Sequence, residues 1–266
     1  MTKIKLIAFD FDGTILEEGL VIPEETRILL EEIVDLGIKI STASGRKLEE
    51  QYMILQKNSM GDSKGWPHFL VVDESKIYIL NNGGYEPFSV WNEFVHQGWI
   101  KVYPEARAIA IEEFERLKRD GINAKLHIID QEAIERNLVG IRFDEVEYAR
   151  AFEEYLARKL QNNKHGLWCN RNYRLVQILP KSAGKGITIY GLSRYLDIHP
   201  EEVLVIGDAG NDLDMLNGRF GFYSAAVSNA EPRVIDVVRG NRGYIASQPI
   251  SKGVTEIIRN IIWDKI

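Results

Sequence analysis

Short apolar segments alternate with amphipathic segments of helical periodicity at both ends of this chain. Near its start, apolar Lys5–Phe9 and Ile38–Ala43 flank Pro23–Leu36, in which apolar side chains recur at helical spacing. The alternation resumes with a helix predicted over Gly186–Leu196 and a strand over Val203–Ile206. Similar elements are predicted at Leu48–Gln56, Phe69–Val72, Asp212–Leu216, Gly221–Val227, Pro232–Val238 and Val254–Ile262. Short apolar strands that alternate with amphipathic helices are typical of a parallel sheet with crossover helices, so this pattern predicts an α/β fold.

The middle of the chain has a different pattern. Helices are predicted over Tyr103–Arg119 and Glu145–Leu160, and other segments alternate as in a sheet with one solvated face. The predicted strands are Ala124–Ile129, Leu138–Phe143, Gly166–Cys169 and Tyr173–Leu179, of which the last two form a hairpin that turns near Asn170–Asn172. Helices against an antiparallel sheet make an α+β domain. We therefore expect a core domain, residues 1–81 and 181–266, interrupted by an inserted domain, residues 82–180.

Composition excludes several classes of protein. The 266 residues include 39 acidic and 33 basic side chains, so the surplus of positive charge that a nucleic-acid partner favours is missing. The single cysteine, Cys169, excludes an intramolecular disulfide and a thiolate zinc cluster. No apolar run approaches the ~20 residues that cross a bilayer, and the first residues do not resemble a signal peptide. We expect a cytoplasmic chain without a membrane partner, either a monomer or a small homo-oligomer.

The motif Asp10-Phe11-Asp12-Gly13-Thr14 directly follows the first predicted strand. Ligand sites of open parallel sheets lie at the carboxyl ends of the strands. A chain that leaves the strand here can aim Asp10 and Asp12 toward one point, and Gly13 permits a sharp turn after them. Two carboxylates in one pocket repel each other unless a cation intervenes or one is protonated. The pair suits a nucleophile and a general acid/base, whereas a plain turn with two solvated aspartates is the alternative.

A second motif, Gly207-Asp208-Ala209-Gly210-Asn211-Asp212, follows the strand predicted over Val203–Ile206. It offers hard oxygen ligands at another strand end. Mg²⁺ prefers such ligands and keeps several waters, so one or two carboxylates here and one from the first motif would hold it. Capping of the helix that begins near Leu213 is the alternative use of Asn211 and Asp212.

Two shorter motifs offer groups that could bind a phosphate. Ser44-Gly45-Arg46 ends the strand predicted over Ile38–Ala43 and places a hydroxyl and backbone N–H groups where a phosphate could lie. Lys185-Gly186 opens a predicted helix, although it is no nucleotide P-loop because Gly186 stands where Ser or Thr is needed. The order and the placement of both motifs, rather than either motif alone, favour a phosphate site.

Charge counting indicates why a metal and a lysine are both needed. A phosphate ester carries a charge of about −2, and Asp10, Asp12 and Asp208 together add a charge of about −3 when they are ionised. One Mg²⁺ ion and Lys185 together contribute a charge of about +3. Without them the dianion would be repelled, and phosphoryl transfer depends mainly on such neutralisation and positioning.

These four motifs, in this order and at these strand ends, resemble those of the haloacid-dehalogenase-like superfamily of aspartyl phosphotransferases. The resemblance implies that Asp10 attacks phosphorus to form an aspartyl-phosphate, and that Asp12 protonates the leaving group and then activates water. It implies that Ser44 and Lys185 hold the phosphoryl oxygens, and that the fold is α/β with a doubly wound, Rossmann-like parallel sheet as its core. The implied Mg²⁺ site consists of Asp10, the backbone carbonyl of Asp12, and Asp208, with Asn211 and Asp212 close by. Further phosphate or substrate contacts are expected from Gly13, Thr14, Gly45, Arg46, Ser75 and Arg174.

The inserted domain resembles the type IIB cap of that superfamily. The segments Val71–Tyr78 and Trp91–Trp99 are similar to those leading into the caps of sucrose-phosphate-phosphatase-like and Cof-like sugar-phosphate phosphatases. Those relatives have an Asn-Gly or Gly-Ser turn where this chain has Asp73-Glu74-Ser75, and Asn81-Asn82-Gly83-Gly84 comes later, so either turn is a candidate to face the substrate. Arginine and tryptophan suit sugar hydroxyls and rings, although exposed sheet faces often carry them. The candidates are Arg142, Trp168, Arg171 and Arg174.

The function that we expect is Mg²⁺-dependent hydrolysis of a small phosphomonoester, with sugar phosphates as the substrate class. A phosphomutase similar to phosphomannomutases would return the phosphoryl group to a sugar instead of releasing phosphate. A phosphoacceptor signalling domain would keep a long-lived phosphoaspartate, against which Asp12 and the large insertion argue. A catalytically silent sugar-binding protein would bind its ligand and release no phosphate, and a dehalogenase would need no acid at Asp12.

Overall fold

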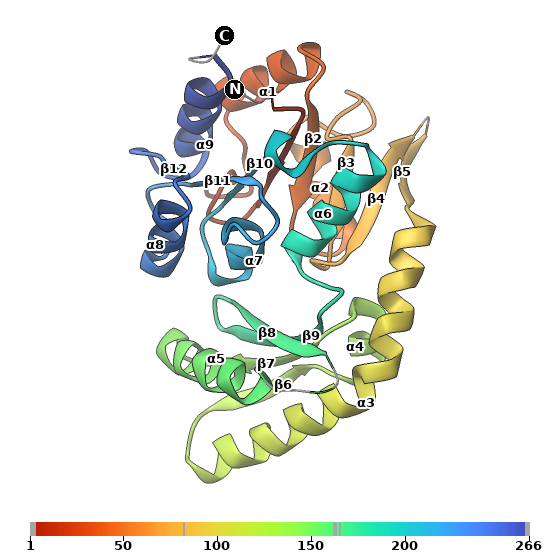
Figure 1. Cartoon of the computed structure of the whole chain (residues 1–266), viewed down its shortest axis with the longest axis vertical. Helices are drawn as coiled ribbons and strands as arrows, with labels where there is room; N and C mark the ends of the chain where they lie inside the picture. Colours follow the sequence, from red (N-terminus) through yellow and green to blue (C-terminus); the bar gives the residue numbers. More distant parts are fainter. Residues whose placement is uncertain (1–3, 82, 162–163, 165, 264–266) are drawn as a thin grey trace. The chain divides into compact units, whose positions relative to one another are not determined.

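This computed structural model describes residues 4–81, 83–161, 164 and 166–263. The two ends of the chain together form an eight-stranded sheet (Figure 1). The strands lie in the order β12-β11-β10-β1-β2-β3-β4-β5. Their bounds are β1 Leu6–Phe9, β2 Lys39–Ala43, β3 Phe69–Val72, β4 Lys76–Asn81, β5 Gly84–Pro87, β10 Val203–Gly207, β11 Tyr223–Ala226 and β12 Tyr244–Ile245. The strands from β12 to β3 are parallel, and β4 and β5 extend the sheet as antiparallel strands.

Helices cover both faces of this sheet. They are α1 Glu24–Asp35, α2 Leu48–Lys57, α6 Lys185–Tyr195, α7 Leu213–Leu216, α8 Pro232–Gly240 and α9 Ile250–Ile258. Ile7 and Phe9 of β1 pack in one apolar cluster with α1 and α9. Leu6 and Ala8 are equally buried and point to the opposite face, since successive side chains of a strand alternate. Helices α6, α7 and α8 contact β3, β10 and β11 without joining that cluster. The doubly wound parallel sheet predicted from the sequence is confirmed.

The order of the strands reverses between β1 and β10. From β1 the chain builds outward through β2 and β3, and later outward on the other side through β10, β11 and β12. Phe9 of β1 pairs in register with Ile206 of β10 and with Thr42 of β2. The three strands therefore end level with one another at a topological switch point, where open α/β sheets bind ligands.

A second, four-stranded antiparallel sheet lies in the middle of the chain, in the order β6-β7-β9-β8. Its strands are β6 Ala124–Ile128, β7 Val139–Phe143, β8 Leu167–Asn172 and β9 Leu175–Pro180, and its helices are α3 Ser89–Arg119, α4 Asp130–Arg136 and α5 Val146–Leu160. Side chains of α3 and α5 pack with this sheet in an apolar cluster of their own. The chain divides into two compact units, Met1–Phe88 with Lys185–Ile266, and Ser89–Gly184.

Several elements differ from the sequence prediction. Helix α3 begins at Ser89 rather than near Tyr103 and passes through Pro104 without ending. Its earlier turns are helical because Val95 and Trp99 continue the buried face that Ala106 and Ile109 form later. The hairpin of β8 and β9 turns at Tyr173, with a φ of 52°, rather than at Asn170–Asn172. The strands β4 and β5 and the helix α4 were not predicted. Of the turn at residues 81–84, Asn82 lies outside the described residues.

Among the described residues, no helix is both long enough and apolar enough to cross a membrane.

Trp99 provides a test of the second unit's core. Its side chain is fully buried, and its indole N–H donates to the carbonyl of Ala133 at 2.8 Å. We expect Trp99→Ala to lower the free energy of unfolding of this unit by about 3–5 kcal/mol, because the truncation leaves a cavity in the core. Urea unfolding measures the change. Val90→Ala on the same helix, at a side chain that is 77% exposed, is the control and should change stability by less than about 0.5 kcal/mol. Equal losses for the two variants would contradict the assignment.

Candidate active site

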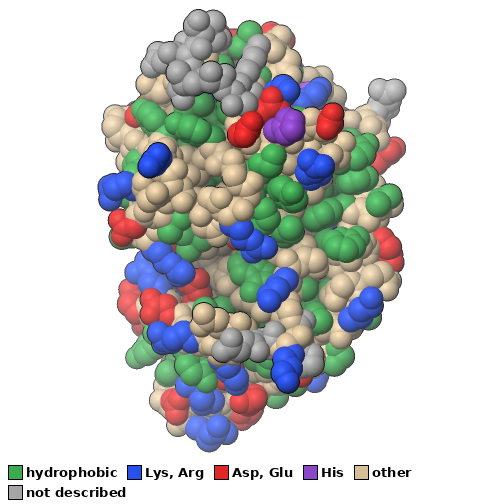
Figure 2. Space-filling view, viewed as in Figure 1, with side chains coloured by type: hydrophobic (Ala, Val, Ile, Leu, Met, Phe, Trp, Pro, Cys, Tyr) green, Lys and Arg blue, Asp and Glu red, His purple; other side chains and the backbone are tan. Residues whose placement is uncertain are grey.

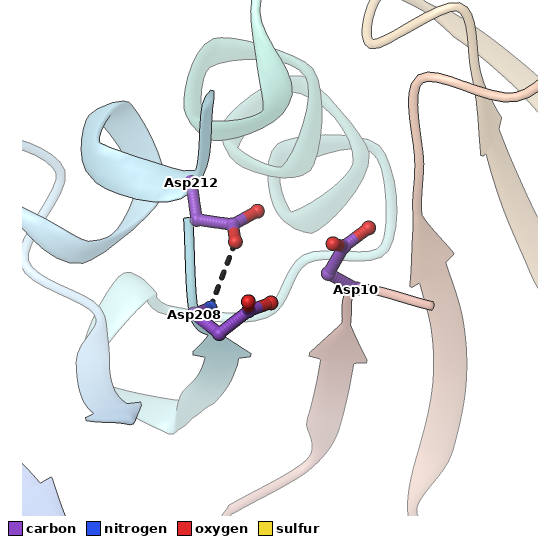
Figure 3. Close-up of side chains that lie close together, drawn as sticks. All are labelled: Asp10, Asp208 and Asp212. Atoms are coloured by element: carbon purple, nitrogen blue, oxygen red, sulfur yellow. Dashed lines mark hydrogen bonds between the residues drawn. The ribbon is translucent and has the colours of Figure 1, made fainter. Parts of the chain in front are cut away.

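Three side chains follow the level ends of neighbouring strands in the first unit. Asp10 comes directly after β1, Ser44 directly after β2, and Asp208 directly after β10. The parallel register of these strands brings together residues that are nearly two hundred positions apart in the sequence. The convergence of Asp10 and Asp208 at one edge of the sheet, which the motifs predicted, is observed (Figure 3).

Asp10, Asp208 and Asp212 form a cluster of carboxylates. Each offers an oxygen atom, and these oxygens lie within 4.8 Å of one another (Figure 3). The Oδ2 atom of Asp212 accepts hydrogen bonds from the backbone N–H groups of Asp208 at 2.9 Å and Ala209 at 3.0 Å. Asp212 therefore also fixes the loop that carries Asp208.

The ammonium group of Lys185 lies between two of these carboxylates. Its Nζ atom is 2.8 Å from Asp10 Oδ1 and 2.6 Å from Asp212 Oδ1, and the lysine is fully buried. Burial alone would lower the pKa of Lys185, but the charges of Asp10 and Asp212 outweigh it and raise this pKa above its usual value. Lys185 thus carries a positive charge wherever the fold is intact.

One ammonium does not neutralise three clustered carboxylates. Burial raises the pKa of Asp10 well above its ordinary value; Lys185 opposes this effect, and Asp212 and Asp208 add to it. Burial, with the charge of Asp212, raises the pKa of Asp208 to about 7, although Thr14 opposes the shift by donating its hydroxyl to Asp208 Oδ1 at 2.6 Å. A group that resists ionisation in this way indicates a site with too little positive charge.

The residues of this site fit a divalent cation. Carboxylate oxygens are the ligands that hard cations prefer. The Oδ1 atom of Asn211, next to Asp212, is buried and has no hydrogen-bond partner among the described residues, so it is a further oxygen donor. The space beside Asp208 requires a glycine, since a Cβ atom at Gly13 would lie 2.9 Å from Asp208 Cγ, and the φ of Gly13 is +78°.

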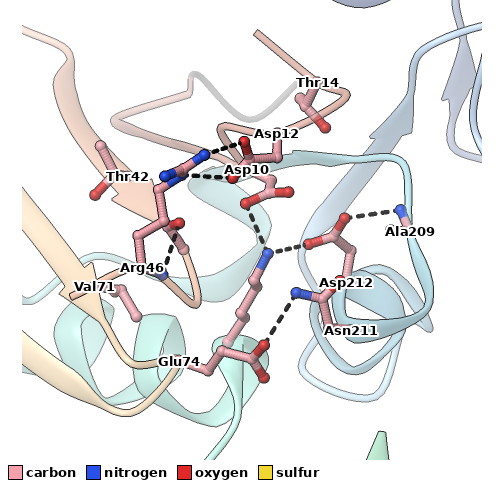
Figure 4. A network of polar contacts seen from close by, with 12 residues as sticks. Asp10, Asp12, Thr14, Thr42, Arg46, Val71, Glu74, Ala209, Asn211 and Asp212 are labelled. Carbon is pink, nitrogen blue, oxygen red and sulfur yellow. Dashed lines mark hydrogen bonds and ion pairs between the residues drawn. The ribbon is translucent and has the colours of Figure 1, made fainter. Parts of the chain in front are cut away.

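Asp12 lies outside the carboxylate cluster. Its side chain is 52% exposed and accepts two hydrogen bonds from the guanidinium of Arg46, from Nε at 2.7 Å and from Nη2 at 2.6 Å (Figure 4). Arg46, which the sequence predicts to contact phosphate or substrate, binds both carboxylate oxygens of Asp12 in this structure. A guanidinium that binds a carboxylate in this geometry can bind a phosphate in the same way.

The turn after β2 already uses two of its backbone N–H groups within the protein. Ser44 is buried, and its Oγ atom accepts a hydrogen bond from the backbone N–H of Arg46 at 3.2 Å. Its backbone N–H donates to the carbonyl of Val71 at 3.2 Å, which ties the turn to the end of β3. Gly45 lies between Ser44 and Arg46 in this turn. The role of this segment toward a phosphate stays a prediction.

Glu74 and Asp214 lie at the site although no sequence motif predicted them. Glu74 is buried in the turn between β3 and β4, and it accepts a hydrogen bond from Asn211 Nδ2 at 3.0 Å (Figure 4). Asp214 Oδ2 accepts from the backbone N–H of Gly186 at 2.8 Å, and burial raises the pKa of Asp214 to about 7. The departure from an Asn-Gly turn at Asp73-Glu74-Ser75 was the available signal for Glu74. The predicted substrate contact Ser75 is buried in the same turn.

The candidates of the inserted segment belong to the second unit. Arg174 donates from Nη1 to the carbonyl of Asp144 at 2.9 Å, and its guanidinium lies 5.4 Å from the centre of the Tyr173 ring. Arg171 is buried and pairs with Glu153 at 3.2 Å. Each of these arginines therefore makes contacts within its own unit, and a role of Arg174 toward the substrate stays a prediction.

The indole of Trp168 donates to the carbonyls of Pro180 and Ala183, each at 3.0 Å. Arg142 lies on β7 with an exposed side chain. These two candidates also belong to the second unit.

Comparisons with known proteins agree on one family. A family model described as haloacid dehalogenase-like hydrolase matches residues 7–63 and 61–241. The chain is 25% identical to the HMP-PP phosphatase of Serratia proteamaculans over 80% of each chain. It is 26% identical to phosphoglycolate phosphatase 1 of Saccharolobus solfataricus over 97% of this chain and 96% of the relative. A similar fold occurs in the sucrose-phosphatase of Synechocystis in complex with sucrose and phosphate, with a TM-score of 0.74, 19% identity and 98% of both chains covered.

The raised pKa values predict that cation binding depends on pH. Below pH 7 Asp208 holds a proton that a cation must displace, whereas above pH 7 its charge is uncompensated. Because the folded-state pKa exceeds the ordinary value of 3.8, the stabilisation due to this group is full below that value and is lost as the pH rises through about 7.

We therefore expect saturating Mg²⁺ to raise Tm by about 5–10 °C at pH 8, and by clearly less at pH 6. Differential scanning fluorimetry measures the shift, and Asp208→Asn is the control in which most of it should disappear. Equal shifts at both pH values in the unmodified protein would contradict this interpretation.

Proposed function

The chain belongs to the haloacid dehalogenase-like hydrolase family, and from that premise we propose that it is a Mg²⁺-dependent phosphatase of small phosphomonoesters. The observation that carries the proposal is the position of Asp10, held at 2.8 Å by Lys185 and clustered with Asp208. A nucleophilic carboxylate, a fixed ammonium and a second metal-binding carboxylate are the groups that phosphoryl transfer to an aspartate requires.

The two units correspond, in this proposal, to the domains expected from the sequence. Met1–Phe88 with Lys185–Ile266 would be the core domain that carries the reaction, and Ser89–Gly184 the cap. Motion of a cap relative to its core can exclude bulk water during transfer and release the product afterwards.

The first step transfers the phosphoryl group to Asp10. Lys185 engages Asp10 Oδ1, so the other oxygen, Oδ2, is available to attack phosphorus. The bond from Asp10 to phosphorus forms while the bond from phosphorus to the leaving oxygen breaks, and Asp12 gives its proton to that oxygen. Ser44 and Lys185 hold the phosphoryl oxygens. When bound by Asp10, Asp208 and the backbone carbonyl of Asp12, with Asn211 and Asp212 close by, Mg²⁺ supplies positive charge that offsets the phosphate's charge.

The second step returns the enzyme to its starting state. Asp12, now a carboxylate, takes a proton from a water molecule whose oxygen attacks phosphorus. The bond between phosphorus and Asp10 breaks, inorganic phosphate leaves, and Asp12 again carries the proton. Asp12 forms an ion pair with Arg46 in the structure, so it must leave that guanidinium and take up a proton from solvent before it acts as the acid. An arriving phosphate can take its place, because a guanidinium binds both anions in the same two-pronged geometry.

Sugar phosphates are the substrate class that we propose. The relatives named above are phosphatases of small phosphorylated molecules, and the sucrose-phosphatase shares the fold along nearly the whole chain. A panel of sugar phosphates, nucleotides and cofactor phosphates, with and without Mg²⁺, tests the class by release of inorganic phosphate. Isomerisation of a sugar phosphate without release of phosphate would instead indicate a phosphomutase.

Replacement of the nucleophile tests the central assignment. We expect Asp10→Asn to lower kcat by at least about 10³-fold, because an amide does not form the acyl-phosphate, while circular dichroism stays that of the folded protein. Asp35→Asn, at an exposed aspartate that ends α1, is the matched control and should keep full activity. An Asp10→Asn protein with near-normal kcat would remove Asp10 from the role of nucleophile.

The acid role of Asp12 predicts a dependence on the leaving group. Asp12→Asn should lower kcat by about 10²–10⁴-fold for a sugar phosphate, whose alkoxide leaving group needs a proton. The first chemical step with p-nitrophenyl phosphate should be affected much less, since nitrophenolate leaves without one. Single-turnover kinetics with both substrates separate this step from the later hydrolysis. The same loss in that step for both substrates would exclude Asp12 as the acid.

A further inference from the structure

The turn between β3 and β4 contains two residues in a backbone conformation that favours glycine. Asp73 and Glu74 have φ values of 49° and 59°. Side chains with a Cβ atom adopt this left-handed region at a cost, and such residues gather at functional sites. Asp73 forms an ion pair with Lys76 at 3.1 Å, three residues along the chain. Glu74 instead points into the protein and is fully buried.

Glu74 connects the turn to three segments of the candidate active site. Its backbone N–H donates to the carbonyl of Ser44 at 3.0 Å. Its carbonyl accepts from Thr188 Oγ1 of α6, the helix that begins with Lys185, at 3.1 Å. Its side chain accepts from Asn211 Nδ2, in the loop after β10, at 3.0 Å (Figure 4). A simple hairpin turn requires none of these contacts.

The contact with Asn211 determines which way that amide faces. An asparagine presents a donor branch, Nδ2, and an acceptor branch, Oδ1, whereas a carboxylate only accepts. Glu74 can therefore be satisfied only by Nδ2, and Oδ1 must point away from Glu74. That oxygen is buried and has no hydrogen-bond partner among the described residues. Asn211 directly precedes Asp212, whose carboxylate belongs to the cluster with Asp10 and Asp208.

We propose that Glu74 is a positioning residue, which holds the Asn211 amide with its oxygen available to the active-site cation or to a water on it. The inference rests on the proposed function, in which the cation serves the reaction. Its direct consequence is a change in the affinity of the chain for that cation. It explains why an acidic side chain occupies a backbone position that glycine would adopt without strain. Partners that orient metal ligands typically change metal affinity by about 10–100-fold when removed.

A pair of glycine substitutions in this one turn tests the proposal. Glu74→Gly and Asp73→Gly each relieve the backbone strain of a residue with positive φ, but only Glu74→Gly removes the hydrogen-bond acceptor for Asn211 Nδ2. We expect Glu74→Gly to weaken Mg²⁺ binding by about tenfold or more in isothermal titration calorimetry. Asp73→Gly should bind Mg²⁺ within about twofold of the unmodified protein. Excess Mg²⁺ should restore phosphate release by Glu74→Gly.

Two further variants separate positioning from a general structural role. Glu74→Gln keeps an acceptor oxygen for Asn211 Nδ2 and should keep the Mg²⁺ affinity within about threefold. In an Asn211→Ala background, Glu74→Gly should have no further effect, because the residue through which it acts is gone. Unchanged Mg²⁺ affinity in Glu74→Gly, a Glu74→Gly protein that does not fold, equal weakening by Glu74→Gln, or full additivity with Asn211→Ala would each overturn the proposal.

The calorimetry needs no substrate, so it separates this inference from the proposed function. If the unmodified chain releases no phosphate but the Mg²⁺ affinities follow the expected order, only the proposed function fails. If it releases phosphate and Asp10→Asn does not, while Glu74→Gly binds Mg²⁺ as Asp73→Gly does, only the role of Glu74 fails. An unmodified chain that binds no Mg²⁺ overturns both.

Discussion

The buried ammonium of Lys185, shared by Asp10 and Asp212, is the interaction on which the rest of the site depends. It joins the end of β1, the start of α6 and the loop after β10, three segments that are far apart in the sequence. A buried charge is tolerated only when it is paired, and removing one partner leaves the others uncompensated. Helix α6 packs tightly against its neighbours beside this lysine, because a Cβ atom at the next residue, Gly186, would lie 2.7 Å from the ring of Phe220.

Much of the core sheet could be predicted, because buried parallel strands are short apolar runs and their helices have a strong period. The bounds predicted for β1, β2, β3 and β10 agree with the structure to within a residue or two. Strand β5 was harder to predict, since it is the exposed edge strand and has no apolar run. Strand β4 was missed although it carries the apolar run Ile77–Leu80. The start of α3 was misplaced because Pro104 resembles the first residue of a helix. Seven-residue α4 is too short to establish a period.

The parts of the site that could be predicted are those that follow a strand directly. Asp10 and Asp208 follow apolar strands, so topology alone brings them to one edge of the sheet. The order of the strands does not determine which turns contact each other. That Glu74 would reach Asn211, or that Asp214 would accept from Gly186, depends on how the turn after β3 and the loops around α6 pack in three dimensions. No spacing in the sequence encodes those pairs, although an acidic residue in a turn that usually carries glycine is a local irregularity of the kind that marks function.

Asp10 and Asp12 are two residues apart and yet have opposite surroundings, which indicates how one motif can supply two chemical roles. Asp10 is buried beside Lys185 and two further carboxylates, where its ionised form depends on nearby positive charge. Asp12 is half exposed and is held by a guanidinium that a second anion can draw away. A fixed carboxylate suits attack on phosphorus, whereas a proton carrier must exchange partners during the reaction. Phe11, which stands between the two aspartates, is fully buried, and the turn at Gly13 follows both of them and lets the chain pass close against Asp208.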